Sequence, residues 1–311
     1  MDIQKRWQEL LITAQRNSVT DIHFLLKGEE MEIKMRSAAG MNEVESSPSD
    51  REVCYYLAYL ANLDLTDQTR PQSGAFHYEL FDKTLYFRYS MLTSLAAISF
   101  SLRILYQKVL REEVSSLKEQ NRLFRDAINA DSGLILLSGP TGSGKTSSAY
   151  SLLKSVKRKE IFTIEDPIEL PLENAVQVQV NLKSGLDYAE GIRQLMRHDP
   201  DIIFIGEIRS EAEARMAIRA ALTGHLVIST IHARSATGVI HRLSDLNVNL
   251  FDFYETCILI SNQRLLSNKD RKGKICLYET MDEEELRYFR EHQKTSPRFL
   301  SLSQQRDQLH L

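Results

Sequence analysis

Hydrophobic residues in the first hundred positions recur with helical or strand-like spacing. One helical face is predicted by Ile3, Trp7, Leu10, Leu11 and Ala14. Strands are predicted by short runs rich in aromatic and β-branched residues, namely Asp21–Leu26, Met31–Met35, Phe76–Phe81, Thr84–Tyr89 and Ile98–Leu105. Ser49 is expected to cap a second helix, and Asp82 and Lys83 to connect a hairpin. Residues 1–106 therefore read as a small α+β domain.

The pattern changes after a polar, charged segment, residues 107–120, which we interpret as a linker. Near-continuous apolar runs then alternate with helical segments, and the runs are Leu134–Leu137, Ile161–Ile164, Ile202–Ile205 and Leu226–Ile231. Buried parallel strands have this pattern because helices cover both faces of their sheet. Residues 121–311 are therefore predicted to form an α/β domain. Beyond Asn247 we expect helices, one further strand at Lys274–Tyr278, and a mobile polar tail from Gln293.

The composition excludes several classes of protein. A net charge of −3, from 42 acidic and 39 basic residues, gives no overall attraction to nucleic acid or anionic lipid. The three cysteines are far apart in sequence and predict neither a disulfide framework nor a thiolate zinc site. The first residues lack the apolar run of a signal peptide, and no apolar stretch is long enough to span a membrane. We therefore expect a cytoplasmic protein.

A phosphate-binding loop follows the first apolar run of the second domain. Its residues match G-x-x-x-x-G-K-[ST] and are Gly139, Pro140, Thr141, Gly142, Ser143, Gly144, Lys145 and Thr146. The glycines allow consecutive N–H groups to face phosphate oxygens, and the following helix adds its positive end. Lys145 is expected to reach the β- and γ-phosphates of ATP, and Thr146 to bind Mg²⁺. The alternative, a chance glycine-rich turn, is disfavoured by the strand and helix on either side.

Acidic residues follow two further strand candidates, where the carboxyl ends of parallel strands face a ligand crevice. In Thr163–Glu169, a carboxylate is placed to orient and deprotonate an attacking water, although a solvated acidic turn is the alternative. In Asp199–Arg209, Gly206 replaces the usual aspartate and leaves Glu207 as the acid at the strand end. An exposed glutamate without a role is the alternative there.

Two histidines, His225 and His232, bracket the run Leu226–Ile231. Their odd separation puts them on opposite faces of a strand, so they are expected to contact different groups. Zinc binding is disfavoured because the sequence places no third ligand beside them. Taken alone, the pair fits two hydrogen-bonded structural histidines better than a site.

Together these motifs resemble the secretion ATPase superfamily, which powers type II secretion, type IV pili and competence pseudopili. The resemblance rests on Thr163–Glu169 as an aspartate box, Arg197–Arg209 as a variant Walker B motif, Ala221–Ala233 as a histidine box, and Gln263-Arg264-Leu265. In the first domain Asp21-Ile22-His23, Phe87–Ser90 and Leu102–Leu105 are similar to family strands. The family's tetracysteine module is missing, so we expect no zinc. The sequence is most similar to the competence-pseudopilus assembly ATPases of Gram-positive bacteria.

The resemblance implies an N-terminal PAS-like domain and a RecA-like P-loop ATPase core that assemble as a homo-hexamer. It implies Glu165 as general base, Glu207 as a residue that orders Mg²⁺ and water, and His232 as a γ-phosphate sensor. It implies Arg88 and Arg103 as arginines that complete the site. The motif residues Asp166, Arg209 and His225 are expected nearby.

The function implied is a motor at the inner face of the cell membrane that hydrolyses ATP to assemble a competence pseudopilus for DNA uptake. Its expected partners are a polytopic membrane platform protein and, indirectly, pilin-like subunits, with no direct contact to nucleic acid. Residues Gln177–Asn181 favour the assembly branch of the family. A pilus-retraction ATPase and a nucleotide-gated binding module with little turnover are the alternatives.

Overall fold

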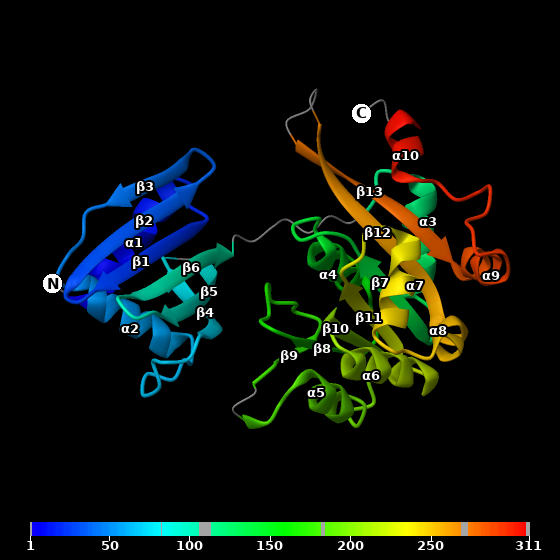
Figure 1. Cartoon of the computed structure of the whole chain (residues 1–311), viewed down its shortest axis with the longest axis horizontal. Coiled ribbons are helices and arrows are strands. Elements are labelled where there is room, and N and C mark those ends of the chain that lie inside the picture. Colours follow the sequence, from blue (N-terminus) through cyan, green and yellow to red (C-terminus); the bar gives the residue numbers. More distant parts are fainter. Residues whose placement is uncertain (1, 82, 106–112, 182–183, 269–272, 309–311) are drawn as a thin grey trace. The chain divides into compact units, whose positions relative to one another are not determined.

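The computed structural model describes residues 2–81, 83–105, 113–181, 184–268 and 273–308 (Figure 1). The chain divides into two compact units, Met1–Lys108 and Val109–Leu311, called unit 1 and unit 2 below. Each unit has a sheet and a hydrophobic core of its own.

Unit 1 is an antiparallel sheet with two helices. Its strands are β1 (Asp21–Lys27), β2 (Glu30–Ser37), β3 (Gly40–Val44), β4 (Gln72–Leu80), β5 (Lys83–Thr93) and β6 (Ile98–Leu105), in the order β3-β2-β1-β6-β5-β4. The helices are α1 (Ile3–Arg16) and α2 (Asp50–Leu60). The predicted hairpin is present, since Leu80 pairs with Lys83. Ser49 precedes α2 as predicted, but its side chain makes no capping bond; instead Asp50 accepts the N–H of Ser47.

The two faces of the unit 1 sheet differ in polarity. Phe87, Tyr89 and Met91 of β5 are buried in the core that the fully buried Trp7 of α1 shares. Arg88, between two of these core residues, points to the other face and is exposed. The alternation follows from the period of two along a strand and leaves one face of the sheet polar.

Unit 2 is built on a seven-stranded sheet of order β13-β12-β7-β11-β10-β8-β9. Its strands are β7 (Gly133–Ser138), β8 (Ile161–Glu165), β9 (Val176–Gln179), β10 (Ile202–Ile208), β11 (Leu226–Ile231), β12 (Cys257–Asn268) and β13 (Gly273–Asp282). All neighbouring pairs in the described residues are parallel except β12 and β13, which are antiparallel. The five strands predicted for the second domain are confirmed, since the four apolar runs lie in β7, β8, β10 and β11 and the segment Lys274–Tyr278 lies in β13.

Helices cover both faces of this sheet, as predicted. The described helices are α3 (Lys118–Ile128), α4 (Lys145–Ser155), α5 (Tyr188–Leu195), α6 (Glu211–Leu222), α7 (Ala236–Asp245), α8 (Leu250–Thr256), α9 (Glu283–His292) and α10 (Leu302–Gln308). One core lies between the sheet and α3 and α4, and a second lies between the sheet and α5, α6 and α7. Consecutive strand residues such as Ile203 and Phe204 enter opposite cores, which explains the uninterrupted apolar runs.

Three segments differ from the sequence-based expectations. Residues Cys257–Asn268, expected to be helical, form β12, which lies between β13 and β7 in the sheet. Lys118–Gln120, assigned to the linker, begin α3, and the Gln120 side chain donates to the carbonyl of Tyr278 at 2.6 Å. Part of that predicted linker, residues 107–112, lies outside the described residues.

The polar tail, expected to be mobile, contains α10, whose Gln305 is fully buried. Its amide donates to the carbonyl of Tyr278 at 2.6 Å and accepts the N–H of the same residue at 3.2 Å. Gln305 thus pairs with the edge strand β13 as a neighbouring strand would. Gln305, together with Ser296 and Arg298, which bond to α9 and the residue before it, therefore holds the tail against unit 2.

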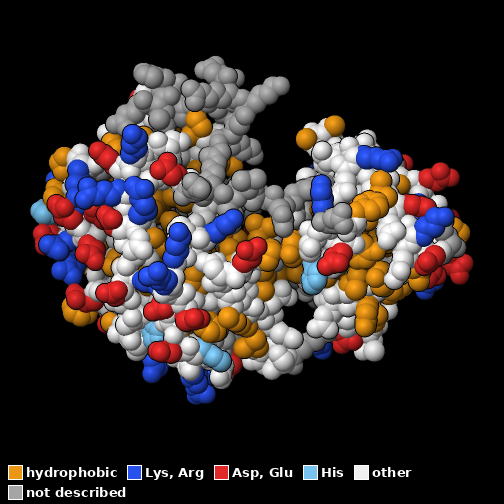
Figure 2. All heavy atoms as spheres, turned by 180° about the vertical axis from the view of Figure 1, so that it is seen from behind, with side chains coloured by type: hydrophobic (Ala, Val, Ile, Leu, Met, Phe, Trp, Pro, Cys, Tyr) orange, Lys and Arg blue, Asp and Glu red, His pale blue; other side chains and the backbone are white. Residues whose placement is uncertain are grey.

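The surface of the molecule is mixed in charge, as the small net charge predicts. Figure 2 shows acidic and basic side chains interspersed on the face seen from behind, with apolar side chains between them. Cys54, Cys257 and Cys276 are buried. None of the helices in the described part of the chain has the length and apolar character that a membrane span requires.

Candidate nucleotide site

The predicted phosphate-binding loop connects the end of β7 to the start of α4. Gly139, Gly142 and Gly144 have positive φ angles of 143°, 78° and 92°. Residues that carry a side chain rarely adopt such angles. A Cβ atom on Gly139 would lie 2.5 Å from the backbone oxygen of Gln263, so glycine is also needed there for space. The loop therefore has the left-handed turns that direct backbone N–H groups toward an anion.

Lys145 begins α4 and is largely buried at the loop. Its Nζ donates to the carbonyls of Gly139 at 3.0 Å and Pro140 at 3.3 Å. Burial lowers the pKa of this ammonium group, and the carboxylates of Glu207 and Glu169 oppose the shift. Two carboxylates therefore lie close enough to the loop lysine for their charge to act on it.

Glu207 lies at the carboxyl end of β10, where the pairing with β11 shifts register between Ile205 and Ile208. Such an irregularity redirects a side chain out of the regular strand alternation. The Glu207 carboxylate contacts His232 Nε2 at 3.0 Å and Arg209 Nη2 at 2.8 Å. The structure therefore joins three predicted site residues in one polar cluster, and both the imidazole and the guanidinium remain about half exposed.

Gly206 occupies the position where the usual aspartate is missing. A Cβ atom there would lie 3.2 Å from the Tyr188 hydroxyl and 3.3 Å from Cα of Glu165. Strands β8 and β10 thus leave little room for a side chain. The Gly206 carbonyl also accepts a hydrogen bond from the Thr230 hydroxyl at 2.7 Å. This bond links β10 to β11 at the residue before Glu207.

Glu165, predicted as the general base, ends β8 and is only 2 % exposed. Its carboxylate accepts hydrogen bonds from Tyr150, from Thr163 at 2.7 Å and from Gln177 at 3.2 Å. Burial raises the pKa of this carboxyl group, while the three donors act in the opposite direction. A carboxylate in this state has no oxygen turned to water, so it cannot take a proton from an attacking water without leaving its partners.

Glu169, four residues later, differs from Glu165 in its surroundings. It is exposed, and its charge acts on Lys145. Its N–H donates to the Tyr150 hydroxyl at 3.3 Å, so the tyrosine that holds Glu165 also positions the backbone of Glu169. The sequence placed both glutamates in one acidic turn, but only the structure distinguishes the buried one from the exposed one.

The remaining predicted residues lie in different places. Asp166 is exposed, and its charge acts on Arg209. His225 precedes β11 at the end opposite to the loop, with Nδ1 3.1 Å from the Ala220 carbonyl and 3.2 Å from the Thr223 hydroxyl. His225 therefore holds the turn between α6 and β11 and does not join the site.

Arg88 and Arg103 belong to unit 1. They are direct neighbours across β5 and β6 on the polar face of the sheet. Arg103 Nε donates to Asp21 Oδ1 at 2.7 Å, and its side chain remains 62 % exposed. The assignment of these arginines to the nucleotide stays a prediction.

Residues of β12 around the loop were missed by sequence reasoning. Gln263 Nε2 donates to the Ser143 carbonyl of the loop at 2.6 Å. Asn262 Nδ2 donates to Ser138 Oγ at 2.9 Å, directly before the loop. The segment Gln263-Arg264-Leu265 had been noted only as part of a resemblance, because nothing in its sequence indicates a contact with the loop.

Thr146 and Glu207 supply the hydroxyl and carboxylate oxygens that Mg²⁺ prefers. The Glu207 carboxylate retains 17 % exposure and acts on Lys145, so an oxygen donor is available beside the loop, and these residues fit the ion. In the described part of the chain, no group of three or more His, Cys, Asp or Glu residues is arranged to hold a metal ion by itself.

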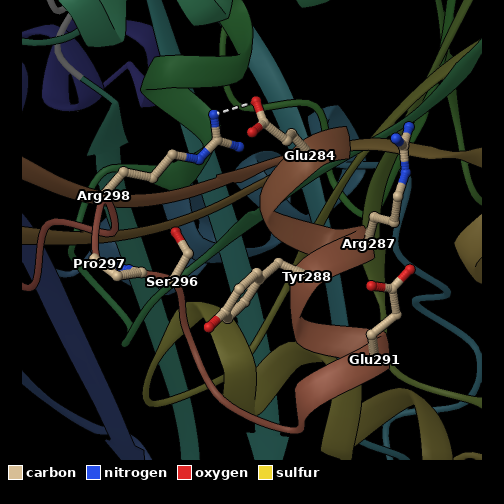
Figure 3. Close-up of a pocket in the computed structure, with 7 residues that line it drawn as sticks. All are labelled: Glu284, Arg287, Tyr288, Glu291, Ser296, Pro297 and Arg298. Atoms are coloured by element: carbon tan, nitrogen blue, oxygen red, sulfur yellow. Dashed lines mark hydrogen bonds and ion pairs between the residues drawn. The ribbon is translucent and has the colours of Figure 1, made fainter.

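A surface pocket lies at α9 and the segment after it. It is lined by Glu284, Arg287, Tyr288, Glu291, Ser296, Pro297 and Arg298. Figure 3 shows Arg298 paired with Glu284 at this pocket. None of the predicted site residues is among those that line it, so the phosphate loop remains the candidate site.

Comparison with known proteins identifies the family of the chain. The family described as "Type II/IV secretion system protein" matches residues 2–302. Competence protein ComGA of Bacillus subtilis is 32% identical over 273 residues, which cover 85% of this chain and 76% of the relative. Type IV pilus assembly ATPase PilB of Acinetobacter baylyi is 36% identical over 271 residues, 85% of this chain but only 47% of the relative.

Among solved structures, the pilus retraction motor PilT with bound ADP matches with a TM-score of 0.73. The match covers 96% of this chain and 95% of that one at 23% identity, a level that establishes the fold alone. Unit 2 has the RecA-like ATPase fold of these proteins. With a family match over nearly its whole length, the chain belongs to the type II/IV secretion system protein family.

Proposed function

We propose that this chain is the ATP-driven motor subunit of a type IV pilus-like machine and powers assembly of a competence pseudopilus used for DNA uptake. As a member of its family the chain is a secretion ATPase, which hydrolyses ATP to ADP and phosphate. The observation that carries the proposal is the cluster of Glu207, His232 and Arg209 beside a complete phosphate loop. The similarity to a competence protein and to a pilus assembly ATPase favours assembly over retraction.

The loop and its surroundings suggest a division of roles. Lys145 holds the β- and γ-phosphates once it leaves the carbonyls of Gly139 and Pro140. Thr146 and Glu207 hold Mg²⁺, which when bound offsets the negative charge of the phosphates. His232, bonded to Glu207, responds to the γ-phosphate.

Glu169 accepts the proton of the attacking water, because it is the exposed carboxylate of the acidic turn that faces Lys145. Glu165 instead fixes Tyr150 and, through its hydroxyl, the backbone of Glu169. This proposal differs from the sequence-based expectation that Glu165 is the base, and the variants below distinguish the two.

The subunits act as a homo-hexamer at the inner face of the membrane, against a polytopic platform protein that contacts pilin-like subunits. Arg88 and Arg103 stabilise the charge that develops on the transferred phosphoryl group in this ring. An arginine on a mobile domain can couple the chemical step to motion.

Phosphate release with Mg²⁺ and ATP tests the catalytic roles. Glu169→Gln is expected to lower kcat by about 100-fold or more, the usual contribution of a general base, whereas Glu165→Gln keeps kcat within a few fold. Lys145→Ala is the inactive control. Full activity of Glu169→Gln together with an inactive Glu165→Gln would return the base to Glu165.

Deletion of the gene in cells distinguishes an assembly motor from a retraction motor. Loss of surface filaments and of DNA uptake is expected for an assembly motor. Filaments that persist and become more numerous would identify a retraction motor. Wild-type protein that binds ATP but releases no phosphate with its platform partner would instead indicate a nucleotide-gated binding module.

A further inference from the structure

Strand β12 contains three consecutive buried polar residues where an apolar run is the rule. Ser261, Asn262 and Gln263 are no more than 1 % exposed, and β12 lies directly beside β7 in the sheet (Figure 1). Central strands of parallel sheets are usually apolar because both faces are covered. Buried polar side chains carry a desolvation cost, so their presence calls for a physical reason.

Gln263 lies against the phosphate loop at its first residue and near its end. Its Nε2 donates to the Ser143 carbonyl at 2.6 Å and would lie 3.3 Å from a Cβ on Gly144. Its backbone oxygen would lie 2.5 Å from a Cβ on Gly139, the first residue of the loop. The shape of the loop is therefore fixed against this one residue.

Asn262 connects the loop to the segment that carries His232. Its Nδ2 donates to Ser138 Oγ at 2.9 Å and to the Ala233 carbonyl at 3.1 Å. Ser138 directly precedes the loop, and Ala233 directly follows His232. One amide group thus contacts both the loop and the histidine segment.

Arg264, the next residue, donates from Nη2 to the carbonyl of Arg234 at 2.6 Å, so β12 holds the histidine segment at two successive carbonyls. The charge of Arg264 also acts on Lys145. The same stretch of strand therefore contacts both parts of the site through its backbone and its side chains.

Several buried polar atoms in this region have no hydrogen-bond partner. They are Gln263 Oε1, Asn262 Oδ1, Ser261 Oγ and Ser143 Oγ. A buried polar group left unpaired costs about 1–3 kcal/mol, and such groups in native proteins need an explanation. These two hydroxyl groups and two amide oxygens therefore have unused hydrogen-bonding capacity in β12 and the loop.

We propose that Asn262 and Gln263 are positioning residues that couple the phosphate loop to His232. Gln263 fixes the conformation of the loop whichever nucleotide is bound. Asn262 makes the position of His232, which contacts Glu207, depend on the conformation of the loop. The inference rests on the proposed role of His232 toward the γ-phosphate, and it assigns the connection to β12. Neither residue touches the reacting atoms.

Nucleotide affinities test the two roles separately, using ADP and a non-hydrolysable ATP analogue on the full chain. Gln263→Met keeps the volume but removes the donor to Ser143, so it is expected to weaken both ligands alike, by about tenfold for one lost hydrogen bond to the loop. Asn262→Leu is expected to leave ADP affinity within about twofold and to abolish the distinction between ADP and the analogue, as His232→Ala does.

The double variant Asn262→Leu/His232→Ala provides the decisive comparison. Because Asn262 acts through His232, adding the second change should alter the analogue affinity no further. Additive effects, or an Asn262→Leu variant that weakens both nucleotides by the same factor, would overturn the proposal. These readouts need binding only, so they stand even if the chain turns out not to power a motor.

Gln305→Ala is the matched control for a general loss of stability. Gln305 is also a fully buried glutamine that bonds to this sheet, but its partner is Tyr278 on β13. Its removal should lower the urea midpoint of unit 2 and leave the ratio of the two affinities unchanged. A change in that ratio would show that the ratio of affinities responds to a loss of stability alone. It would refute the assignment of Asn262 and Gln263 as positioning residues.

Discussion

The stability of Glu165 variants tests whether this carboxylate is a buried structural group, as we propose, and not the catalytic base. In Glu165→Ala, two buried donors lose their acceptor, Tyr150 and Thr163, while the half-buried Gln177 keeps its bond to the Leu170 carbonyl. An unpaired buried donor costs about 1 kcal/mol or more, so unit 2 should lose about 2 kcal/mol or more. Glu165→Gln keeps an acceptor oxygen and the side-chain volume, and both hydroxyl donors can rotate, so its loss should stay near 1 kcal/mol.

The stability of these variants is also expected to depend on pH differently from that of the wild type. Burial raises the pKa of Glu165 above its ordinary value of 4.5, so the folded chain binds this proton more tightly than the unfolded chain. The stability of the wild type therefore falls as the pH rises above that value, and the fall ends once the folded carboxyl has ionised. Glu165→Gln has no such group. Its stability relative to wild type should therefore improve as the pH rises above the ordinary value of 4.5, until the folded carboxyl of the wild type has ionised.

Urea unfolding followed by far-ultraviolet circular dichroism measures both effects. Trp7 is the single tryptophan of the chain and lies in the core of unit 1, so its fluorescence is an internal control. The fluorescence midpoint should not move in either variant. Equal losses for Ala and Gln, or a pH profile of the Gln variant parallel to wild type, would refute the description of Glu165 as a buried hydrogen-bonded anchor.

Three further predictions concern the loop, the polar face of unit 1 and the sheet edge. Gly139→Ala should abolish binding of a fluorescent ATP analogue because its Cβ meets backbone 2.5 Å away, whereas Gly142→Ala, with open space around it, should weaken binding only partly. Arg88→Ala should leave the urea midpoint unchanged, because the side chain is exposed, but should slow phosphate release; an unchanged rate would exclude Arg88 from catalysis. Gln305→Ala should destabilise unit 2 by about 2 kcal/mol through two lost bonds to Tyr278, and a midpoint equal to wild type would show that α10 does not protect the edge.

The sequence predicted those elements whose pattern of residues is determined locally. The apolar runs of β7, β8, β10 and β11 were recognisable because both faces of each strand are buried. The phosphate loop was recognisable because its glycines and Lys145 occur at a fixed spacing. Local geometry determines these features, so local sequence is enough to find them.

The features that were missed depend on distant partners. Strand β12 has Asn262 and Gln263 at its centre, and this polar interruption hides a buried strand until Ser138 and Ser143 are known to accept their hydrogen bonds. The tail seemed mobile because Gln305 is polar, yet its partner lies on β13. No pattern within a short window can reveal such pairs.

The acidic turn shows the same limit in the assignment of roles. Glu165 and Glu169 are equivalent by residue type and adjacent to the same strand. Tyr150, on α4, makes their surroundings different, because its hydroxyl bonds to the Glu165 carboxylate and to the backbone N–H of Glu169. Sequence spacing could place the two glutamates in one turn, but the burial of one and the exposure of the other depend on the packing of α4.

The burial of all three cysteines has a practical consequence for watching the two units move. Burial raises the thiol pKa of Cys54 and Cys257, and Cys276 is also enclosed, so maleimide dyes should leave the native thiols unlabelled. Cysteines introduced at Tyr59 and Phe251, which are 70% and 66% exposed, could then carry a donor and an acceptor without removal of any native residue. Energy transfer between the dyes would report the separation of the two units through each round of nucleotide turnover.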